Sequence, residues 1–246
     1  MPKLKSWTTT NNYKIHWLVW GKCNVYLVQV HNHNILIDTG PGIRYHLLEK
    51  ELQHILSKNQ SLTYIIHTHT HFDHCQNTVR VQNQFGGETL VHQQAEQCVE
   101  NGYTTLSDGT YFVTKILARL GNAIGKTKFG YPAFSANLII GNAHTINDLN
   151  IDIINTPGHS PDSCSVLVDN EIALVGDTLL GLVRNKVFPI YANDVPALLK
   201  SWKNLLNTDC HTFLPGHGKP VSREMLLVEF EKMKLKYSRK QALSEV

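Results

Sequence analysis

The chain has 246 residues, of which 42% are hydrophobic and 17% charged, so it can form one large domain or two small ones without disulfide support. Its formal net charge of +3 is too weak to indicate a nucleic-acid-binding protein. No stretch approaches the roughly 18 apolar residues of a membrane span. We therefore expect neither a membrane nor a nucleic acid as a partner. The unusual feature is a total of 14 histidines, because histidine is the commonest metal ligand in proteins.

The five cysteines are an odd number and form no CxxC pair. The N-terminal residues lack the apolar segment of a secretory signal. Free thiols are typical of proteins in a reducing compartment, so we expect a cytoplasmic location.

Short apolar or alternating segments, bounded by turn residues, predict strands along most of the chain. They lie at residues 13–20, 23–30, 34–37, 63–66, 89–91, 139–140, 149–155, 164–168, 172–175 and 212–214. Helical spacing of apolar residues predicts helices at 44–57, 73–85, 110–123, 195–206 and 222–242. The regular succession of predicted strands is interrupted at segment 93–136, and we interpret this segment as a helical cap insertion.

The strands occur in two sets with helices after each set. This order favours two packed sheets with helices on their outer faces over one doubly wound sheet. No low-complexity linker divides the chain. We therefore expect a single α+β domain over residues 1–246.

Residues 67–74 read HTHTHFDH, which places four histidines and one aspartate within eight residues. Such groups are costly to bury unless an ion holds them together, and imidazole with carboxylate suits zinc, iron or manganese. His69 and His71 point to the same side of an extended segment and can hold one ion. Asp73 and His74 begin the next helix and can hold a second ion nearby.

Three more candidate ligands each follow a short apolar strand: His159, Asp177 and His217. Pro-Gly precedes both of these histidines. If the strands run side by side, all these candidates meet at one edge of the sheets, where rigid strands hold them in place.

The run from His69 to His74 matches the HxHxDH motif and resembles the metallo-β-lactamase-fold hydrolases. The remaining motifs of that superfamily match in order at Asp38, His159, Asp177 and His217. The resemblance implies a four-layer αββα sandwich, in which two mixed β-sheets are flanked by helices. It also implies a site for two divalent metal ions, with zinc as the first expectation and iron or manganese as alternatives.

By this resemblance the first ion is bound by His69, His71 and His159. The second ion is bound by Asp73, His74 and His217, and Asp177 bridges both. Asp38 would orient the ligands by hydrogen bonds, although turn chemistry before Gly40 explains it equally well.

The implied reaction is hydrolysis by a hydroxide that the two metal ions activate, with Asp73 as the catalytic residue that orients the nucleophile and then protonates the leaving group. Secreted zinc β-lactamases normally have a cysteine at the position of Asp177 and carry export signals, so a β-lactam is not the expected substrate. The pattern is nearest to glyoxalase II-like thioesterases and to lactonases. Only one predicted helix follows His217, too little for a glutathione-binding domain. We therefore expect a small-molecule lactone, ester or thioester as substrate.

Two alternatives remain open. The first is a phosphodiesterase or nuclease of the same fold, for which segment 93–136 would have to be a nucleic-acid clamp. That segment contains four cations but also Phe112, Leu117, Tyr131 and Phe134, which favour an apolar lid. The second is a non-hydrolytic metal-binding or redox protein, against which the complete ligand set argues. A homodimer is common in the superfamily and is a possible assembly.

The loop after Asp177 should border the site. Its candidates for substrate contact are Arg184, Phe188, Tyr191 and Asn193. His67 and Cys75 flank the ligands, and we interpret them as a structural histidine and a small buried side chain.

Overall fold

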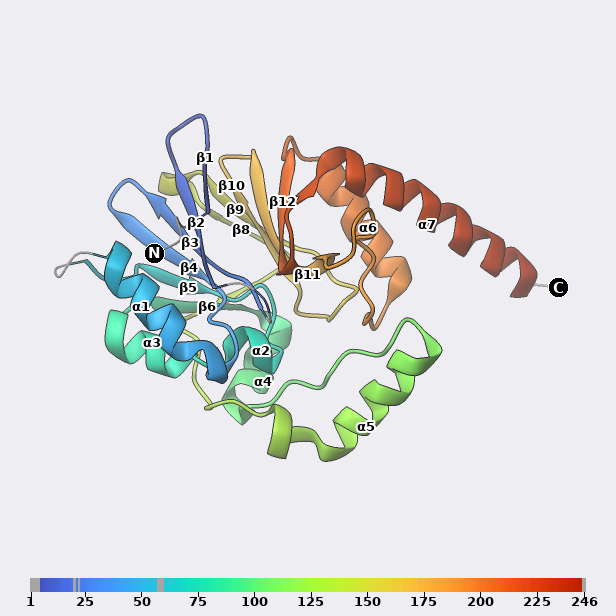
Figure 1. Cartoon of the computed structure of the whole chain (residues 1–246), viewed down its shortest axis with the longest axis horizontal. Helices are drawn as coiled ribbons and strands as arrows, with labels where there is room; N and C mark the ends of the chain where they lie inside the picture. Colours follow the sequence, from blue (N-terminus) through green and yellow to red (C-terminus); the bar gives the residue numbers. More distant parts are fainter. Residues whose placement is uncertain (1–4, 20, 22, 57–59, 245–246) are drawn as a thin grey trace.

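The computed structural model describes residues 5–19, 21, 23–56 and 60–244, and its strands form two mixed β-sheets (Figure 1). The seven-stranded sheet has the order β1 (Ser6–Thr8), β2 (Lys14–Val19), β3 (Val25–Val30), β4 (His33–Ile37), β5 (Tyr64–Ile66), β6 (Glu88–His92) and β7 (Leu138–Ile140). The six-stranded sheet has the order β13 (Val221–Ser222), β12 (Thr212–Gly218), β11 (Ile172–Gly181), β10 (Cys164–Val168), β9 (Ile151–Asn155) and β8 (Ala143–Ile146). Strands β4 to β7 are parallel, as are β11 and β12.

Helices cover both outer faces of the sheet pair (Figure 1). The first sheet packs against α1 (Tyr45–Ile55) and α3 (Thr78–Phe85), and the second against α6 (Val195–Leu206) and α7 (Arg223–Ser244). The sequence-based expectation of a four-layer αββα sandwich is confirmed. Three helices lie near or beyond the ends of the strands: α2 (Phe72–Cys75), α4 (Glu96–Asn101) and α5 (Phe112–Phe129).

Strand β3 shows how the alternating pattern builds these layers. Tyr26, Val28 and Val30 face the core between the sheets, whereas Val25 and Leu27 face the layer formed with α1. Successive side chains of a strand point to opposite faces, so an uninterrupted apolar strand is required where both faces are covered. Burial of both faces fixes the register and therefore the positions of the strand ends that carry the site.

Helix α6 is anchored beside the site. The indole Nε1 of Trp202 donates a hydrogen bond of 2.8 Å to the carbonyl of Thr178 in β11, and the Trp202 side chain is fully buried. The helix begins where the sequence predicts, at Val195, and Asp194 caps it by accepting a bond of 2.9 Å from the backbone N–H of Ala197.

The expected helix over 73–85 is wrong as a single element, because α2 and α3 are separate. The carbonyl of His74 accepts hydrogen bonds from the backbone N–H groups of Thr39 and Gly40, at 2.7 and 3.2 Å. The side chain of Asn77 donates to the carbonyls of residues 39 to 41. The turn that follows β4 therefore uses groups that a continuous helix would need.

The predicted ends of two strands are also wrong. Asp177 lies inside β11 and His217 inside β12, rather than in loops after them. The pairing of β11 with β12 shifts register around Gly176, so a bulge presents Asp177 to the site without ending the strand. The strands β1, β8 and β13 are absent from the expected set because they are short or half-exposed.

Segment 93–136 contains α4 and α5, as the interpretation of a helical insertion requires. Whether it forms a separate functional cap stays a prediction. Within the residues that the structure describes, no helix is long and apolar enough to cross a membrane.

We predict that Gly158→Ala destabilises the protein by about 2 kcal/mol or more. Gly158 has a φ of 134°, and a Cβ there would lie 2.4 Å from the backbone of Leu198 in α6. Gly141→Ala is the matched control, because a Cβ there has no atom within 4 Å, and we expect a change within about 0.5 kcal/mol. Urea unfolding gives the free energy of unfolding of both variants, provided that their m-values are equal. Equal free energies for Gly158→Ala and Gly141→Ala would contradict the packing argument.

Candidate metal centre

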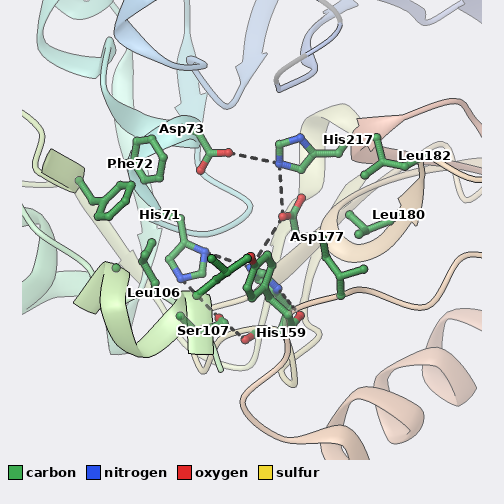
Figure 2. Close-up of a pocket in the computed structure, with 16 residues that line it drawn as sticks. His71, Phe72, Asp73, Leu106, Ser107, His159, Asp177, Leu180, Leu182 and His217 are labelled. Carbon is green, nitrogen blue, oxygen red and sulfur yellow. Dashed lines mark hydrogen bonds and ion pairs between the residues drawn. The ribbon is translucent and has the colours of Figure 1, made fainter. Parts of the chain in front are cut away.

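Five of the seven candidate ligands line one pocket (Figure 2): His71, Asp73, His159, Asp177 and His217. The segment after β5 supplies His69, His71, Asp73 and His74, the loop after β9 supplies His159, and β11 and β12 supply Asp177 and His217. Their ligand atoms form three overlapping groups whose members lie within 4.8 Å of one another. The structure therefore brings together all seven residues that the sequence singles out as metal ligands.

The first ligand group is His69, His71 and His159. His71 Nδ1 and His159 Nε2 lie 3.0 Å apart. The other ring nitrogen of each histidine faces a carbonyl oxygen, that of Thr105 at 3.2 Å and that of Tyr191 at 2.9 Å. If each ring donates its proton to that carbonyl, two lone pairs face each other, an arrangement that a cation between them stabilises.

The second ligand group is Asp73, His74 and His217. His217 Nε2 lies 3.3 Å from Asp73 Oδ2. Asp177 contacts both groups, because its carboxylate lies 3.5 Å from His74, 3.4 Å from His217 and 3.8 Å from His159. Asp177 therefore lies between the two ligand groups, and its role as a bridging ligand stays a prediction.

His69 Nε2 is buried and has no hydrogen-bond partner, whereas His74 Nε2 and Asp177 Oδ1 are buried and make no hydrogen bond but lie 3.5 Å from each other as an ion pair. Unsatisfied buried polar atoms are rare, since each costs about 1–3 kcal/mol. Gly216 leaves room beside them, because a Cβ there would lie 2.5 Å from Asp177 Oδ1 and from His74 Cε1. The donor set of imidazoles and carboxylates and the direction of its free atoms fit divalent metal ions.

The two groups differ in their electrostatics. Burial and the neighbouring imidazoles lower the pKa of His69 well below its ordinary value, and burial with the adjacent His159 lowers the pKa of His71 to about 4. Burial also opposes charging of His74 and His217, but nearby acidic groups, Asp177 among them, outweigh it and raise the pKa of each well above its ordinary value. Burial would raise the pKa of Asp177, yet these two histidines hold it well below its usual range.

Two buried aspartates hold the ligand segment by its threonines. Asp38 accepts bonds of 2.8 Å from the backbone N–H and from the hydroxyl of Thr68, and its Oδ2 also lies 2.8 Å from His74 Nδ1. Asp162 accepts the same pair of bonds, both 2.8 Å, from Thr70. Asp38 thus has the orienting position that was predicted for it, together with a turn conformation of φ 60°.

Asp162 was not found by sequence reasoning. Its only sequence signal is its place three residues after His159, and nothing in that spacing shows that it reaches Thr70. Cys23 was likewise missed. Its thiol lies 3.6 Å from His74 Nδ1, and burial raises the pKa of this thiol.

The four candidates for substrate contact lie in different places. Tyr191 lines a cavity at the ligand cluster. Asn193 accepts a bond of 2.8 Å from the backbone N–H of Asp108, so its side chain ties the loop to the cap segment. Phe188 packs against Trp202 in the core under α6, and Arg184 is exposed outside the cavity lining. Contact of any of them with a substrate stays a prediction.

The two flanking residues, His67 and Cys75, are both buried. His67 Nε2 lies 3.0 Å from the hydroxyl of Thr78, and the Cys75 thiol lies 3.3 Å from the carbonyls of Thr70 and His71. Both positions agree with the structural roles expected for them.

A cavity of about 530 Å³ opens onto the ligands (Figure 2). Its polar end is formed by His71, Asp73, His159, Asp177 and His217. Its walls are mostly apolar and come from α2, α5, the loop before α5 and the segments around β11. The apolar lining residues are Phe72, Leu106, Leu117, Ala118, Gly121, Phe129, Leu180, Leu182 and Ile190. Of the four lid residues expected from the sequence, Leu117 lines this cavity, Phe112 is exposed, and Tyr131 and Phe134 pack in a separate small core.

Residues 18–217 match the family model described as the metallo-beta-lactamase superfamily. The chain belongs to this superfamily. A probable metallo-hydrolase from Methanocaldococcus jannaschii is 26% identical over 201 residues, which cover 80% of this chain and 87% of that protein.

Two further relatives are matched over only about half of their own length. A lactamase-like protein from Pestalotiopsis microspora is 25% identical over 80% of this chain and 50% of the relative. An atrochrysone carboxyl ACP thioesterase from Claviceps purpurea is 23% identical over 81% of this chain and 52% of the relative. The chain therefore spans about half the length of these relatives.

Solved structures share the fold. The BLEG-1 B3 metallo-beta-lactamase superposes with a TM-score of 0.65 at 21% identity and covers 86% of this chain and 95% of its own. A metallo-beta-lactamase variant from Cronobacter sakazakii superposes with a TM-score of 0.67 at 15% identity and covers 99% of both chains. At these identities the likeness shows the fold alone.

We predict that the second ligand group loses its ion first when the pH falls. A metal ion must displace any proton that a ligand histidine carries. The raised pKa values of His74 and His217 mean that these rings bind protons at neutral pH in the metal-free protein, whereas His69 and His71 are already neutral. From about pH 8 to about pH 6, cobalt(II) titrations should show weakening of one site and little change in the other. Parallel weakening of both sites would contradict this order.

We also predict that Asp162→Ala weakens binding of the first ion by about tenfold or more. The variant leaves the backbone N–H of Thr70 without its acceptor, and this residue lies between His69 and His71. Asp148→Ala is the control, because Asp148 is an exposed aspartate that is not among the candidate ligands. Zinc competition titrations measure the affinity, and unchanged binding in Asp162→Ala would show that this clamp does not position the ligands.

Proposed function

We propose that this protein is a dinuclear metal-dependent hydrolase that cleaves an activated acyl bond, a thioester, ester or lactone, of a small molecule with an apolar acyl part. The observation that carries the proposal is the cavity, in which the ligand cluster forms one end and apolar side chains form the walls. Among the described residues that line it, none is lysine or arginine. Such a lining suits an acyl chain and offers no cation for a phosphodiester.

The ligand set would bind two divalent ions, with zinc as the first expectation and iron or manganese as alternatives. When bound, such ions polarise a carbonyl oxygen and lower the pKa of water. We assign the proton transfer to Asp73. Its side chain lines the cavity, and its Oδ2 atom faces His217, so we assign Oδ1 as the atom that carries the proton to the leaving group.

Asp73 begins the reaction ionised. Burial would raise the pKa of this carboxyl, but its hydrogen bond with His217 and the charge of His74 outweigh burial and lower it. An ionised carboxylate can orient a water molecule and accept its proton before passing one on. The relatives named as acyl-carrier-protein thioesterases support an acyl thioester among the substrates.

A substrate panel tests the proposed function. The metal-reconstituted protein should show its highest kcat/KM with acyl thioesters, aryl esters or acylated lactones, and a lower value with a chromogenic β-lactam and with bis-p-nitrophenyl phosphate. Asp73→Asn should lower kcat for the preferred substrate by about a hundredfold or more while the protein remains folded. A preference for the phosphodiester or the β-lactam would overturn the proposal.

We predict that Ala118→Leu shifts the preference toward short acyl chains. Ala118 is buried and lines the cavity, so a larger side chain there occupies the space proposed for the acyl chain. We expect kcat/KM for an octanoyl substrate to fall about tenfold more than that for an acetyl substrate. Ala123→Leu on the exposed side of α5 is the control. Equal effects on both chain lengths would place the acyl group elsewhere.

A further inference from the structure

Helix α5 is amphipathic, but its apolar face is exposed on the surface and its small residues face the protein. Its large apolar side chains point outward, and six of them are between 45% and 79% exposed: Phe112, Val113, Ile116, Leu117, Leu120 and Ile124. They recur at intervals of three and four residues and therefore form one continuous apolar face. A helix of an ordinary globular protein buries such a face.

The inward side of α5 is made of small or polar residues. Ala118 and Gly121 are buried, and the side chain of Asn122 exchanges hydrogen bonds of 2.9 and 3.1 Å with the backbone of Leu106. The ring of Phe129 packs against that of Phe72 in a tilted arrangement, with ring centroids 4.9 Å apart. These contacts hold the helix in its orientation, so the outward apolar face is a built feature of the fold.

The same helix is positively charged. Lys115, Arg119, Lys126 and Lys128 are exposed, and the sequence contains no aspartate or glutamate from residue 109 to residue 147. Lys115 and Arg119 lie one turn apart and form a cationic row beside the apolar face. An apolar helix face next to exposed cations is the pattern of helices that lie in the interface of an anionic membrane.

The apolar face continues into the cavity. Leu117 belongs to both, since it is half-exposed on the helix and also lines the cavity. Leu182 and Ile190 extend the apolar surface across the opening, and both are exposed and line the cavity as well. Any surface that covers α5 therefore also covers the entrance to the site.

From these contacts and charges we propose that α5 docks the protein onto an anionic lipid surface, with the cavity entrance facing the lipid. A helix that lies at a membrane surface does not need to be long enough to span the membrane. The inference goes beyond the proposed reaction, because lipid binding requires neither metal nor turnover. If both hold, amphiphilic acyl compounds would pass from the lipid into the cavity.

A second copy of the chain fits this surface less well. In a two-fold contact the same patch meets itself, so the cations of one α5 would face those of the other. The long stretch without acidic residues offers no partner for them. An anionic lipid surface supplies both the apolar phase and the opposite charge.

Vesicle co-sedimentation tests the proposal with the full chain. We expect binding to vesicles of phosphatidylcholine and phosphatidylglycerol, and binding weaker by about tenfold or more to phosphatidylcholine alone or at high salt. The double variant I116S/L120S should reduce binding to anionic vesicles by about tenfold or more. The variant K115E/R119E should do the same while retaining the apolar face.

The matched control is L227S/V228S, which removes two side chains of similar exposure from α7 and should leave vesicle binding unchanged. Circular dichroism and metal content confirm that each variant is folded. Absence of binding to anionic vesicles, or equal binding by I116S/L120S and the unmodified chain, overturns the proposal. A dimer in light scattering that I116S/L120S dissociates, without vesicle binding, overturns it in favour of a second copy. None of these readouts depends on hydrolysis.

Discussion

The structure depends on holding five imidazoles and two carboxylates within a few ångströms of one another in a buried place. His71 and His159 present nitrogen atoms to each other at 3.0 Å while their other nitrogens face carbonyl oxygens. Such an arrangement costs free energy unless a cation occupies the space between the rings. The surrounding fold must therefore be rigid enough to keep these groups together before any ion arrives.

That rigidity comes from strands whose two faces are both buried and from two aspartates. Asp38 and Asp162 each bind a threonine of the run from His67 to His71 through its backbone N–H and its hydroxyl. The two threonines flank His69, and each is also next to a second histidine, so fixing them fixes the direction of these imidazoles. A carboxylate accepts stronger hydrogen bonds than a neutral group does. This explains why aspartates hold the threonines although a carboxylate is costly to bury.

Alternation and helical spacing are local signals, and they were sufficient to predict two sheets with helices on their outer faces. The seven candidate ligands followed from the dense histidine run and from the order of the family motifs, and the structure brings these residues together. The sequence was insufficient for Asp162, whose role depends on a contact with a residue 92 positions away. It also placed Asp177 and His217 beyond their strands, because a bulge next to glycine resembles a turn when only the sequence is read. Contacts between distant segments and irregular strand pairing are properties of the folded chain.

Helix α5 shows another property that cannot be predicted from the sequence, namely whether the apolar face of a helix points toward the protein or away from it. Apolar periodicity correctly indicates a helix there, but a period of 3.6 residues does not distinguish a face that packs on the protein from one that meets another phase. In the structure the small residues Ala118 and Gly121 face the cavity and allow the helix to pack closely against it. The large side chains of Ile116 and Leu120 are exposed on the other side. The wall of the cavity and the exposed apolar surface are thus two sides of one helix. A change in how α5 lies would alter both the volume offered to an acyl chain and the surface offered to a lipid.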